Sequence, residues 1–406
     1  MRVIKALVVV ALFAVVAIAV LLGLMWLDHN RETSLPTPTG PFAVGRTTYV
    51  WSDPAQADTM APQPSTKREL LAWIWYPAAP RQPSQTFDDY LSAPWRTALE
   101  RQSGALLTQF LTRDLSRVHA HSIRDAEVSP QQHSYPVVLM RAGLAALTTD
   151  YTTLAEDLAS HGYVVVGFDA PYRSFVVVFP DGRVIARVPQ NNADLVSGPA
   201  QEQLANKLAQ AWSADLGFAL DQLEQLNTSD PSGRFAGRLD MERVGVFGHS
   251  LGGATALQFC HDDSRCKAGI DVDGAPLGSV VADGVAQPFM FLLSDHKGES
   301  DADEPEAIRQ AGANIHSIYD RLPNDRRLMI MIRGAGHYRF SDDGAMLKSP
   351  VVMRVLRTVG VMRLDGRRQV ALTAHYISTF FDVYLKEAAA SELRSRAEYP
   401  EIEYIH

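Results

Sequence analysis

One serine of this 406-residue chain lies in a pattern that could make it a nucleophile. Residues 243–257 read RVGVFGHSLGGATAL, in which an apolar run predicts a strand and the residues after the serine predict a helix. A Gly-x-Ser-x-Gly turn in this context presents the serine hydroxyl at a sharp, strained bend, where side chains larger than glycine would collide with the backbone. The predicted turn consists of Gly248, His249, Ser250, Leu251 and Gly252, followed by Gly253. The alternative is a glycine-rich turn without chemistry.

An activated serine needs a general base, which in this type of fold follows both the serine and an acid along the chain. The histidines that follow the candidate acids are His296, His316, His337, His375 and His406. His316 and His375 lie in helical patterns, and His406 is the last residue. His337 follows an apolar strand pattern and a Gly-Ala-Gly loop, in MIMIRGAGHYRFSD, so this loop can carry an imidazole over the edge of the sheet. We therefore predict His337 as the base.

Three aspartates at the ends of predicted strands are candidates for the acid that orients this histidine. Asp271 and Asp273 end the apolar run in KAGIDVDGAPLG, and they point the same way if the run is a strand. Buried carboxylates are costly without partners, so at least one of the two should have one. Asp295 follows the next strand pattern, in FLLSDHKG. The strand patterns alone leave Asp273 and Asp295 as equal candidates.

Two backbone amides are expected to stabilise the negative charge that forms during attack on a carbonyl group. One is the N–H of Leu251, directly after the nucleophile, and the other comes from the loop after an earlier strand. That loop reads RAGLAAL over residues 141–147. Because the main chain is the donor, Leu144 is the predicted second residue of this oxyanion hole.

The elements that must position these residues alternate between strands and helices. Apolar strand patterns such as YPVVLMRAG, YVVVGFDAP and RRLMIMIRG are separated by helical patterns, including a long amphipathic one over about 201–226. The earlier runs GRTTYVWS and ELLAWIWYPA predict an antiparallel pair at one sheet edge, and a hairpin is predicted around residues 180–182. The sequence thus predicts an α/β-hydrolase fold with a mostly parallel central sheet and helices on both faces.

The N-terminus carries a membrane-targeting element. Residues 6–27, ALVVVALFAVVAIAVLLGLMWL, are apolar over the length that spans a bilayer and follow Arg2 and Lys5. The stretch is longer than the core of a signal peptide, so we predict an uncleaved signal anchor with the rest of the chain outside the cytoplasm; secretion after cleavage is the alternative. The predicted division is an anchor over 1–27, a polar Pro/Thr-rich tether over 28–41 and a catalytic domain over 42–406.

Composition and charge exclude other classes of protein. Hydrophobic residues make up 46% and charged residues 21% of the chain, as in a globular protein with a large core. The net charge of −8 and the lack of a long Lys/Arg block argue against nucleic-acid binding. Cys260 and Cys266, in CHDDSRC, have no further cysteines or histidines at the spacing of a zinc site. In an oxidising compartment the two cysteines predict a disulfide bond. Two free thiols are the alternative. We expect no metal and no cofactor, and the sequence leaves the oligomeric state open.

Together, these motifs resemble a known family. From about residue 41 to 387 the chain resembles the plasma-type (type II) platelet-activating-factor acetylhydrolases and their bacterial α/β-hydrolase relatives. The matching segments include ELLAWIWYPA, YPVVLMRAGLAALTTDYTTLAEDLASHGYVVVGFDAPYRS, RVGVFGHSLGGATAL, AGIDVDGAPLG and IRGAGHYRFSD. The resemblance implies a calcium-independent serine hydrolase acting on phospholipid esters with short or oxidised acyl chains. Bacterial relatives also include general carboxylesterases and polyester hydrolases.

The resemblance also ranks the site residues. The family's acid precedes a turn toward Pro-Leu-Gly, which here implies Asp273 rather than Asp295. It likewise implies Ser250 as nucleophile, His337 as base, and the amides of Leu144 and Leu251 as oxyanion donors. Asp271 stands where the family tends to have an apolar or small polar residue, so we interpret it as a hydrogen-bonding neighbour. Relatives often have a His-Gly pair in this loop, and here Ala142 replaces the histidine. The oxyanion loop therefore lacks the hydrogen bonds that this histidine could make.

The combined prediction is a membrane-anchored serine hydrolase that cleaves carboxylic esters through an acyl-enzyme, with short-acyl or oxidised phospholipids as preferred substrates. A general carboxylesterase or polyester hydrolase is the alternative among enzymes. Among proteins that are not enzymes, the alternative is a catalytically inactive, membrane-anchored binding protein.

Overall fold

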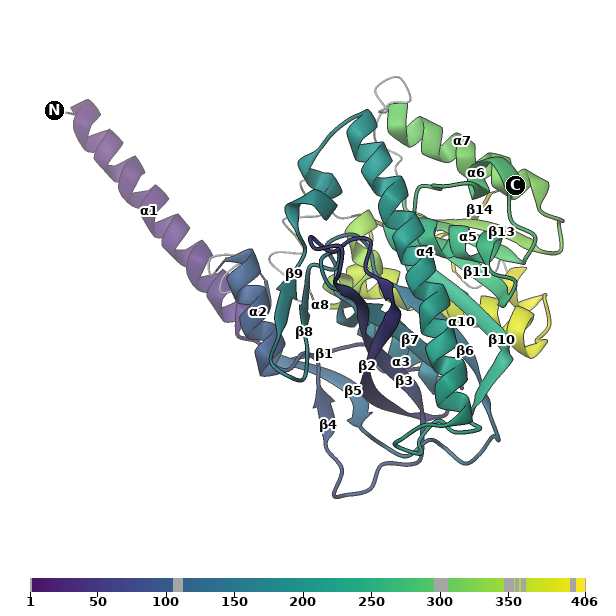
Figure 1. Cartoon of the computed structure of the whole chain (residues 1–406). Helices are drawn as coiled ribbons and strands as arrows, with labels where there is room; N and C mark the ends of the chain where they lie inside the picture. Colours follow the sequence, from purple (N-terminus) through teal and green to yellow (C-terminus); the bar gives the residue numbers. More distant parts are fainter. Residues whose placement is uncertain are drawn as a thin grey trace.

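The computed structural model describes residues 2–104, 112–295, 306–346, 354, 358, 363–394 and 399–405. Its main body is a large sheet with helices on both faces, and helix α1 (Arg2–His29) extends away from this body (Figure 1). The other α-helices are α2 (Ala93–Ser103), α3 (Thr152–Ser160), α4 (Pro199–Thr228), α5 (Leu251–Asp262), α6 (Val280–Asp283), α7 (Glu306–Arg321), α8 (Asp342–Met346) and α10 (Gly366–Lys386). Short 3₁₀ helices are η2 (Leu115–Arg117), η3 (Thr148–Tyr151), η4 (Pro189–Asn191), η5 (Ala193–Leu195), η6 (His337–Phe340) and η7 (Glu392–Arg394).

The strands of the large sheet follow the order β1-β5-β2-β3-β7-β6-β10-β11-β12-β13-β14, and β4 pairs with β5. Their bounds are β1 (Thr33–Ser34), β2 (Ala43–Ala57), β3 (Lys67–Ala78), β4 (Phe87–Asp89), β5 (Val118–Arg124), β6 (Tyr135–Arg141), β7 (Val164–Asp169), β10 (Leu239–His249), β11 (Cys266–Val272), β12 (Phe289–Leu293), β13 (Arg327–Ile332) and β14 (Ile402–Tyr404). A separate hairpin joins β8 (Val176–Val178) to β9 (Val184–Ala186), around the predicted turn. Within the large sheet, the neighbouring strands β7, β6, β10, β11, β12 and β13 are parallel to one another, which confirms the predicted α/β architecture.

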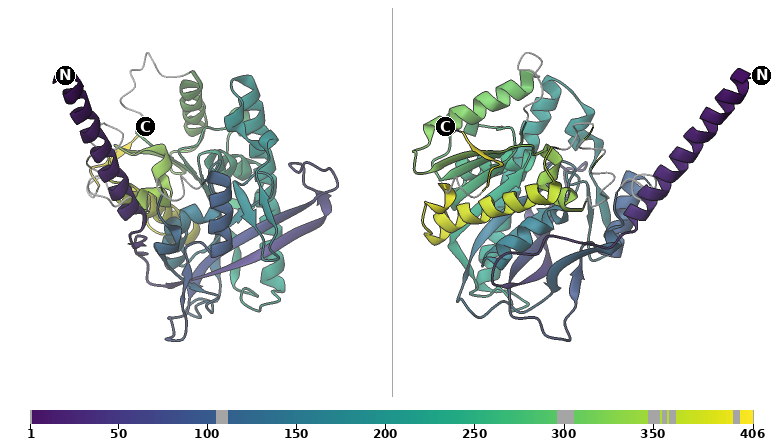
Figure 2. Two further views of the ribbon diagram at one scale, coloured as in Figure 1. Left: turned by 90° about the vertical axis from the view of Figure 1, so that its left-hand side faces the viewer. Right: turned by 180° about the vertical axis from the view of Figure 1, so that it is seen from behind.

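Two hydrophobic cores lie on opposite faces of the central strands. On one face, side chains of α3 and α10 pack against alternate residues of β6 and β10, such as Val138 and Phe247. On the other face, α4, α5 and α7 pack against the intervening residues, such as Val137 and Val246. Alternate side chains of a strand point to opposite faces, so central strands covered by helices on both sides must be apolar throughout. Helix α4 lies across the front face in Figure 1, and α10 lies in front in the right-hand view of Figure 2.

One edge of the sheet differs from the prediction. β2 and β3 form the expected antiparallel pair, but β5 lies beyond β2, and β1 and β4 pair with β5. The β5 segment, VHAHSIR, contains histidines, a serine and an arginine, so it lacks the apolar pattern of the other strands. Pairing with β2 and burial of its inward-facing side chains make it a strand nevertheless.

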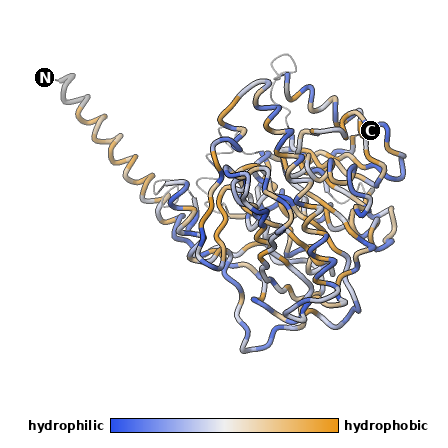
Figure 3. The backbone as a smooth tube through the Cα atoms, viewed as in Figure 1, coloured by the Kyte–Doolittle hydropathy of each residue, from blue (hydrophilic) through white to orange (hydrophobic). Residues whose placement is uncertain are grey.

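Helix α1 is apolar over most of its length (Figure 3). Its side chains from Val8 to Leu27 are largely exposed. Within the described residues, one helical segment, Val8–His29, is long and apolar enough to cross a membrane, and none of its most apolar 18-residue window is buried in the protein. The following segment was predicted to be a tether, yet much of it lies on the domain. Leu35 is buried, β1 pairs with β5, and the Thr39 amide donates to Asp157 Oδ1 over 2.9 Å. Burial of apolar surface and backbone pairing therefore hold these residues against the body.

Candidate active site

The predicted turn around Ser250 joins β10 directly to α5. Ser250 has φ +56° and ψ −126°, a left-handed conformation that costs energy for a residue with a side chain. A Cβ atom at Gly248 would lie 2.1 Å from the carbonyl oxygen of Gly252, and one at Gly252 would lie 2.3 Å from that of Arg141. These approaches exclude any side chain, so the glycines allow the turn that presents Ser250.

Three side chains from separate strand ends form a chain of hydrogen bonds. His337 Nε2 lies 3.1 Å from Ser250 Oγ, and His337 Nδ1 lies 2.7 Å from Asp273 Oδ2. Ser250 follows β10, Asp273 follows β11, and His337 begins η6 after β13. Because these strands are parallel, their carboxyl ends meet at one edge of the sheet. With the Nδ1 proton donated to the carboxylate, Nε2 can accept the serine proton.

The electrostatics of Asp273 suit a carboxylate that holds an imidazole. Its Oδ1 atom accepts a hydrogen bond from the Ser294 amide over 2.8 Å. Burial by itself raises the pKa of Asp273, but the hydrogen bond and charge interaction with His337, together with Ser294, lower it below its ordinary value. Asp273 is therefore ionised near neutral pH and can stabilise a positive charge on His337.

Asp271 and Asp273 were expected to point the same way if both lay in one strand, but the strand ends between them. β11 ends at Val272, and Asp273 has a φ of +55°, which turns its side chain away from the strand alternation. The Asp271 carboxyl instead lies beneath α5, because a Cβ atom at Gly253 would come within 1.9 Å of Asp271 Oδ1. The same oxygen accepts a hydrogen bond from the Gly274 amide over 2.8 Å. Burial, with a contribution from the charge of Asp273, raises the pKa of Asp271 to about 8.

The competing acid, Asp295, supports the loop that carries the histidine. Its Oδ2 atom accepts a hydrogen bond from the Gly334 amide over 2.8 Å, and its own amide donates to the Ala335 carbonyl over 3.1 Å. The carboxylate that contacts the imidazole is that of Asp273. Asp295 thus lies near His337 in the fold, where it is hydrogen-bonded to the backbone of the loop that precedes His337.

The two predicted oxyanion residues lie close together. Leu251 is the first residue of α5, and Leu144 lies in the loop after β6. Their partly buried side chains pack into one apolar cluster with Met60, Ala193 and Leu208. The close approach of Gly252 to the Arg141 carbonyl also brings the nucleophile turn against this loop. The two residues that are predicted to supply the oxyanion amides therefore lie on segments that meet at the turn of Ser250.

Tyr151 is a neighbour of the site that the sequence did not indicate. Its hydroxyl accepts a hydrogen bond from the Gly143 amide over 3.2 Å and lies 2.7 Å from Nδ1 of His249. The imidazole of His249 packs on that of His337, with ring centroids 4.6 Å apart. Tyr151 and His249 are 98 residues apart in the chain, so no local pattern could have joined them.

The histidines that were considered as the base beside His337 lie elsewhere or outside the described residues. His316 is exposed on α7, and His375 packs against Tyr376 and Tyr399 from α10. His296 and His406 lie outside the described residues. Among the residues that the structure describes, no group of three or more histidine, cysteine or acidic side chains could hold a metal ion.

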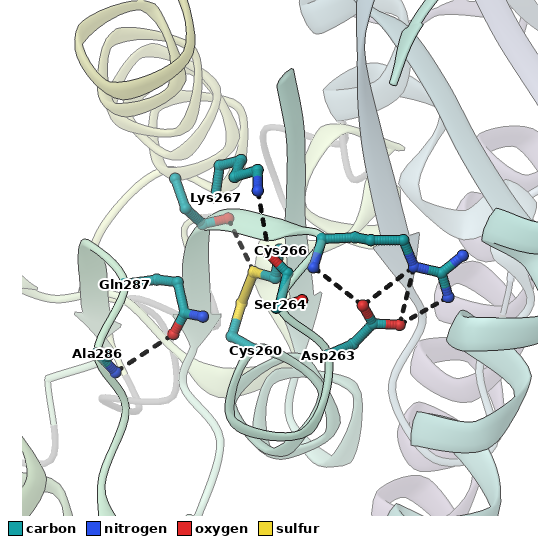
Figure 4. The surroundings of a disulfide bond; sticks show 9 residues. Cys260, Asp263, Ser264, Cys266, Lys267, Ala286 and Gln287 are labelled. Atoms are coloured by element: carbon teal, nitrogen blue, oxygen red, sulfur yellow. Dashed lines mark hydrogen bonds and ion pairs between the residues drawn. A yellow bond between two sulfur atoms is a disulfide. The ribbon is translucent and has the colours of Figure 1, made fainter. Parts of the chain in front are cut away.

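Cys260 and Cys266 are joined by a disulfide bond, with their Cα atoms 5.1 Å apart (Figure 4). Cys260 lies in the last turns of α5, and Cys266 begins β11. Both residues are buried. The bond therefore links the helix that follows Ser250 to the strand that contains Asp271 and precedes Asp273.

Comparison with known proteins identifies the family. Residues 27–388 match the sequence family described as platelet-activating factor acetylhydrolase, isoform II. The chain belongs to this family. The resemblance predicted from the motifs is therefore confirmed, over nearly the same residues.

Curated relatives and a solved structure agree with this membership. The platelet-activating factor acetylhydrolase of Canis lupus familiaris is 24% identical over 349 residues, covering 79% of this chain and 71% of the relative. A probable 1-alkyl-2-acetylglycerophosphocholine esterase of Arthroderma benhamiae is 25% identical over 390 residues, which cover 91% of this chain and 93% of the relative. A ferulic acid esterase from Streptomyces cinnamoneus superposes with a TM-score of 0.73 at 25% identity, covering 93% of this chain and all of that one. The chain is thus an ester hydrolase with the α/β-hydrolase fold.

Proposed function

We propose that this ester hydrolase cleaves carboxylic esters through an acyl-enzyme on Ser250, with His337 as general base and acid and Asp273 as the residue that orients it. The observation that carries the proposal is the continuous series of contacts from Ser250 Oγ to His337 Nε2, and from His337 Nδ1 to Asp273 Oδ2, over 3.1 and 2.7 Å. These are the distances over which a proton can pass from the hydroxyl to the imidazole.

In the proposed first half-reaction, Ser250 Oγ attacks the ester carbonyl carbon while its proton passes to His337 Nε2. The amides of Leu144 and Leu251 stabilise the negative oxygen of the tetrahedral intermediate, aided by the N-terminal end of α5. The intermediate collapses, the alcohol leaves with the proton from His337, and the acyl group stays on Ser250. A water molecule then repeats the attack, with His337 again taking the proton, and the carboxylic acid is released.

We propose short-acyl or oxidised phospholipids as the preferred substrates. Two observations support this choice. The relatives of Canis and Arthroderma are named a platelet-activating factor acetylhydrolase and a probable 1-alkyl-2-acetylglycerophosphocholine esterase. An apolar helix at the N-terminus could also hold the enzyme at a lipid surface. The similarity to a ferulic acid esterase supports a second candidate, a carboxylesterase acting on soluble esters. The ratio of kcat/KM for a 2-acetyl ether phospholipid to kcat/KM for a simple butyrate ester distinguishes the two.

The proposed nucleophile is tested by Ser250→Ala in the full-length protein. We expect at least about 10³-fold loss of kcat on a short-chain p-nitrophenyl ester, because the residual rate would come only from binding and the oxyanion hole. A fluorophosphonate probe should label the unmodified protein at Ser250 and leave the variant unlabelled. Full activity of the variant would refute the site, and an unmodified protein that neither labels nor turns over would favour the inactive binding protein.

We also propose that residues 1–27 anchor the enzyme in a membrane and that the catalytic domain, residues 42–406, lies on the extracytoplasmic side. The exposed apolar surface of α1 supports the anchor, since such a surface is unfavourable in water. The Cys260–Cys266 bond supports an oxidising compartment. Release after signal cleavage is the alternative.

A further inference from the structure

The loop that carries Leu144 is held by side chains from the turn that follows it. Tyr151 accepts a hydrogen bond from the Gly143 amide, and Asp150 Oδ2 accepts one from the Leu147 amide over 2.8 Å. Between them, Ala145 has a φ of +64°, a conformation that side chains rarely adopt. Such a conformation persists only when its surroundings hold it. The two hydrogen bonds therefore hold the loop at both of its ends.

The peptide group that contains the Leu144 amide is fixed by the same arrangement. The carbonyl of that peptide belongs to Gly143, and it accepts a hydrogen bond from the Ala146 amide over 3.2 Å. The amide on the other side of Gly143 donates to Tyr151. Hydrogen bonds on both sides of Gly143 therefore fix the direction in which the Leu144 N–H points.

The Tyr151 hydroxyl also connects this loop to the nucleophile turn. A phenol has one proton, and because the Gly143 N–H occupies an acceptor position, that proton can be donated to Nδ1 of His249. Burial and the neighbouring His337 lower the pKa of His249 to about 3, so its ring is neutral and Nδ1 can accept. His249 directly precedes Ser250 and packs on the His337 imidazole.

We propose that Tyr151 is a positioning residue of the hydrolytic site, whose hydroxyl holds the Leu144 amide and the His249 ring in place around Ser250. The loop at Gly143, the Tyr151 hydroxyl and the His249 ring pack closely together. A Cβ atom at Gly143 would lie 3.3 Å from Tyr151 Oη and 3.3 Å from His249 Nδ1. Removing the hydroxyl leaves the loop free to tilt the Leu144 amide away from the developing oxyanion. Stabilisation of the transition state then falls while substrate binding is retained.

The test is Tyr151→Phe in the full-length, detergent-solubilised protein, with Tyr76→Phe as the matched control. Tyr76 is also fully buried and donates one hydrogen bond, to the Ala126 carbonyl over 2.7 Å, but lies on β3. For a p-nitrophenyl ester we expect Tyr151→Phe to lower kcat by roughly 10- to 100-fold with little change in KM. The inhibition constant of a trifluoromethyl ketone, which forms a tetrahedral adduct on serine, should rise by a similar factor. Tyr76→Phe should lower the melting temperature to a similar degree without these kinetic effects.

A second variant keeps the test decisive if Tyr151→Phe folds poorly. His249→Phe removes the same hydrogen bond from its other end, so by itself it should lower kcat with little change in KM and raise the inhibition constant. Where Tyr151→Phe folds, the effects of the two substitutions on kcat should not multiply in the double variant. A kcat and inhibition constant within about two-fold of the unmodified values, or effects that multiply, would overturn the inference.

The inference rests on the proposed function, and the two fail in different ways. If Ser250→Ala retains activity, the proposed nucleophile is wrong whatever Tyr151 does. If Ser250 is labelled by the fluorophosphonate and is required for turnover, but Tyr151→Phe matches the Tyr76→Phe control, only the role of Tyr151 is wrong.

Discussion

Asp271 and Asp273 are separated by one residue, yet their carboxyl groups have different partners. Asp273 binds the imidazole of His337, whereas Asp271 lies beneath α5, where its Oδ1 accepts from the Gly274 amide. Asp273 is held in its charged form by its partners, and burial favours the neutral form of Asp271. The neutral carboxyl thus fills the space under the nucleophile turn without placing a second negative charge beside the Asp273–His337 pair.

Replacement of Asp271 by Asn should change how stability depends on pH. Between about pH 4, where an unfolded aspartate titrates, and pH 8, the folded protein keeps a proton on Asp271 that the unfolded chain loses. Stability therefore falls as the pH rises through this window, by up to roughly 5 kcal/mol. Asp271→Asn removes this contribution, so its free energy of unfolding, measured in urea from pH 5 to 8, should decline less steeply.

The other buried acids titrate in both proteins, so the difference between the two curves isolates Asp271. Asp320→Asn, on the exposed side of α7, is the control and should leave the slope unchanged. Because the neutral amide can still accept from the Gly274 N–H, kcat of Asp271→Asn should stay within about five-fold. Parallel curves for Asp271→Asn and the unmodified protein would contradict a neutral Asp271.

Asp273→Asn should lower kcat by about 10³- to 10⁴-fold, because an amide neither fixes the tautomer of His337 nor stabilises its positive form. Asp295→Asn keeps an oxygen that can accept from the Gly334 amide, so its kcat should fall less than about five-fold. Steady-state kinetics on a soluble ester measure both. The reverse pattern would assign the acid to Asp295.

Removing the disulfide should weaken the fold without changing the chemistry. The bond closes a loop of only a few residues, so Cys260→Ser together with Cys266→Ser should lower the free energy of unfolding by about 2 kcal/mol. Because the bond lies at the end of α5 remote from Ser250, kcat at 25 °C should be unchanged. Urea titration with and without reductant checks this. An unmodified protein that is insensitive to reductant would count against a structural role.

Deleting residues 2–27 should convert a membrane-bound enzyme into a soluble one. The side chains of α1 from Val8 onward are largely exposed, and Asp28, whose carboxylate pairs with Arg113 over 3.3 Å, is retained. We therefore expect the shortened chain to leave the carbonate-washed membrane fraction, with kcat on a soluble ester within about two-fold. In intact cells, a membrane-impermeant fluorophosphonate should label the full-length chain, with Ser250→Ala as the control. Labelling only after lysis would place the domain inside the cytoplasm.

Much of the fold could be predicted because its central strands are covered on both faces. β6 and β7 are buried along their whole length, so their sequences are apolar up to their last residues, Arg141 and Asp169, and stand out between amphipathic helices. β5 and the residues around β1 carry no such signal, because they lie near a sheet edge and owe their structure to pairing. The contacts of the segment after α1 with Asp157 and β5 are likewise not encoded in that segment's own composition.

The sequence by itself determined the turn at Ser250 and favoured His337, because a glycine pattern between a strand and a helix is a local signal of backbone geometry. Family resemblance was needed to prefer Asp273 over Asp295, since both follow apolar strands. Only the tertiary structure decided which carboxylate meets the imidazole. It did so through the end of β11 at Val272 and the positive φ of Asp273, which turn one carboxyl toward His337 and leave Asp271 beneath α5. The contact of Tyr151 with His249 likewise depends on packing between segments far apart in the chain, which no local periodicity records.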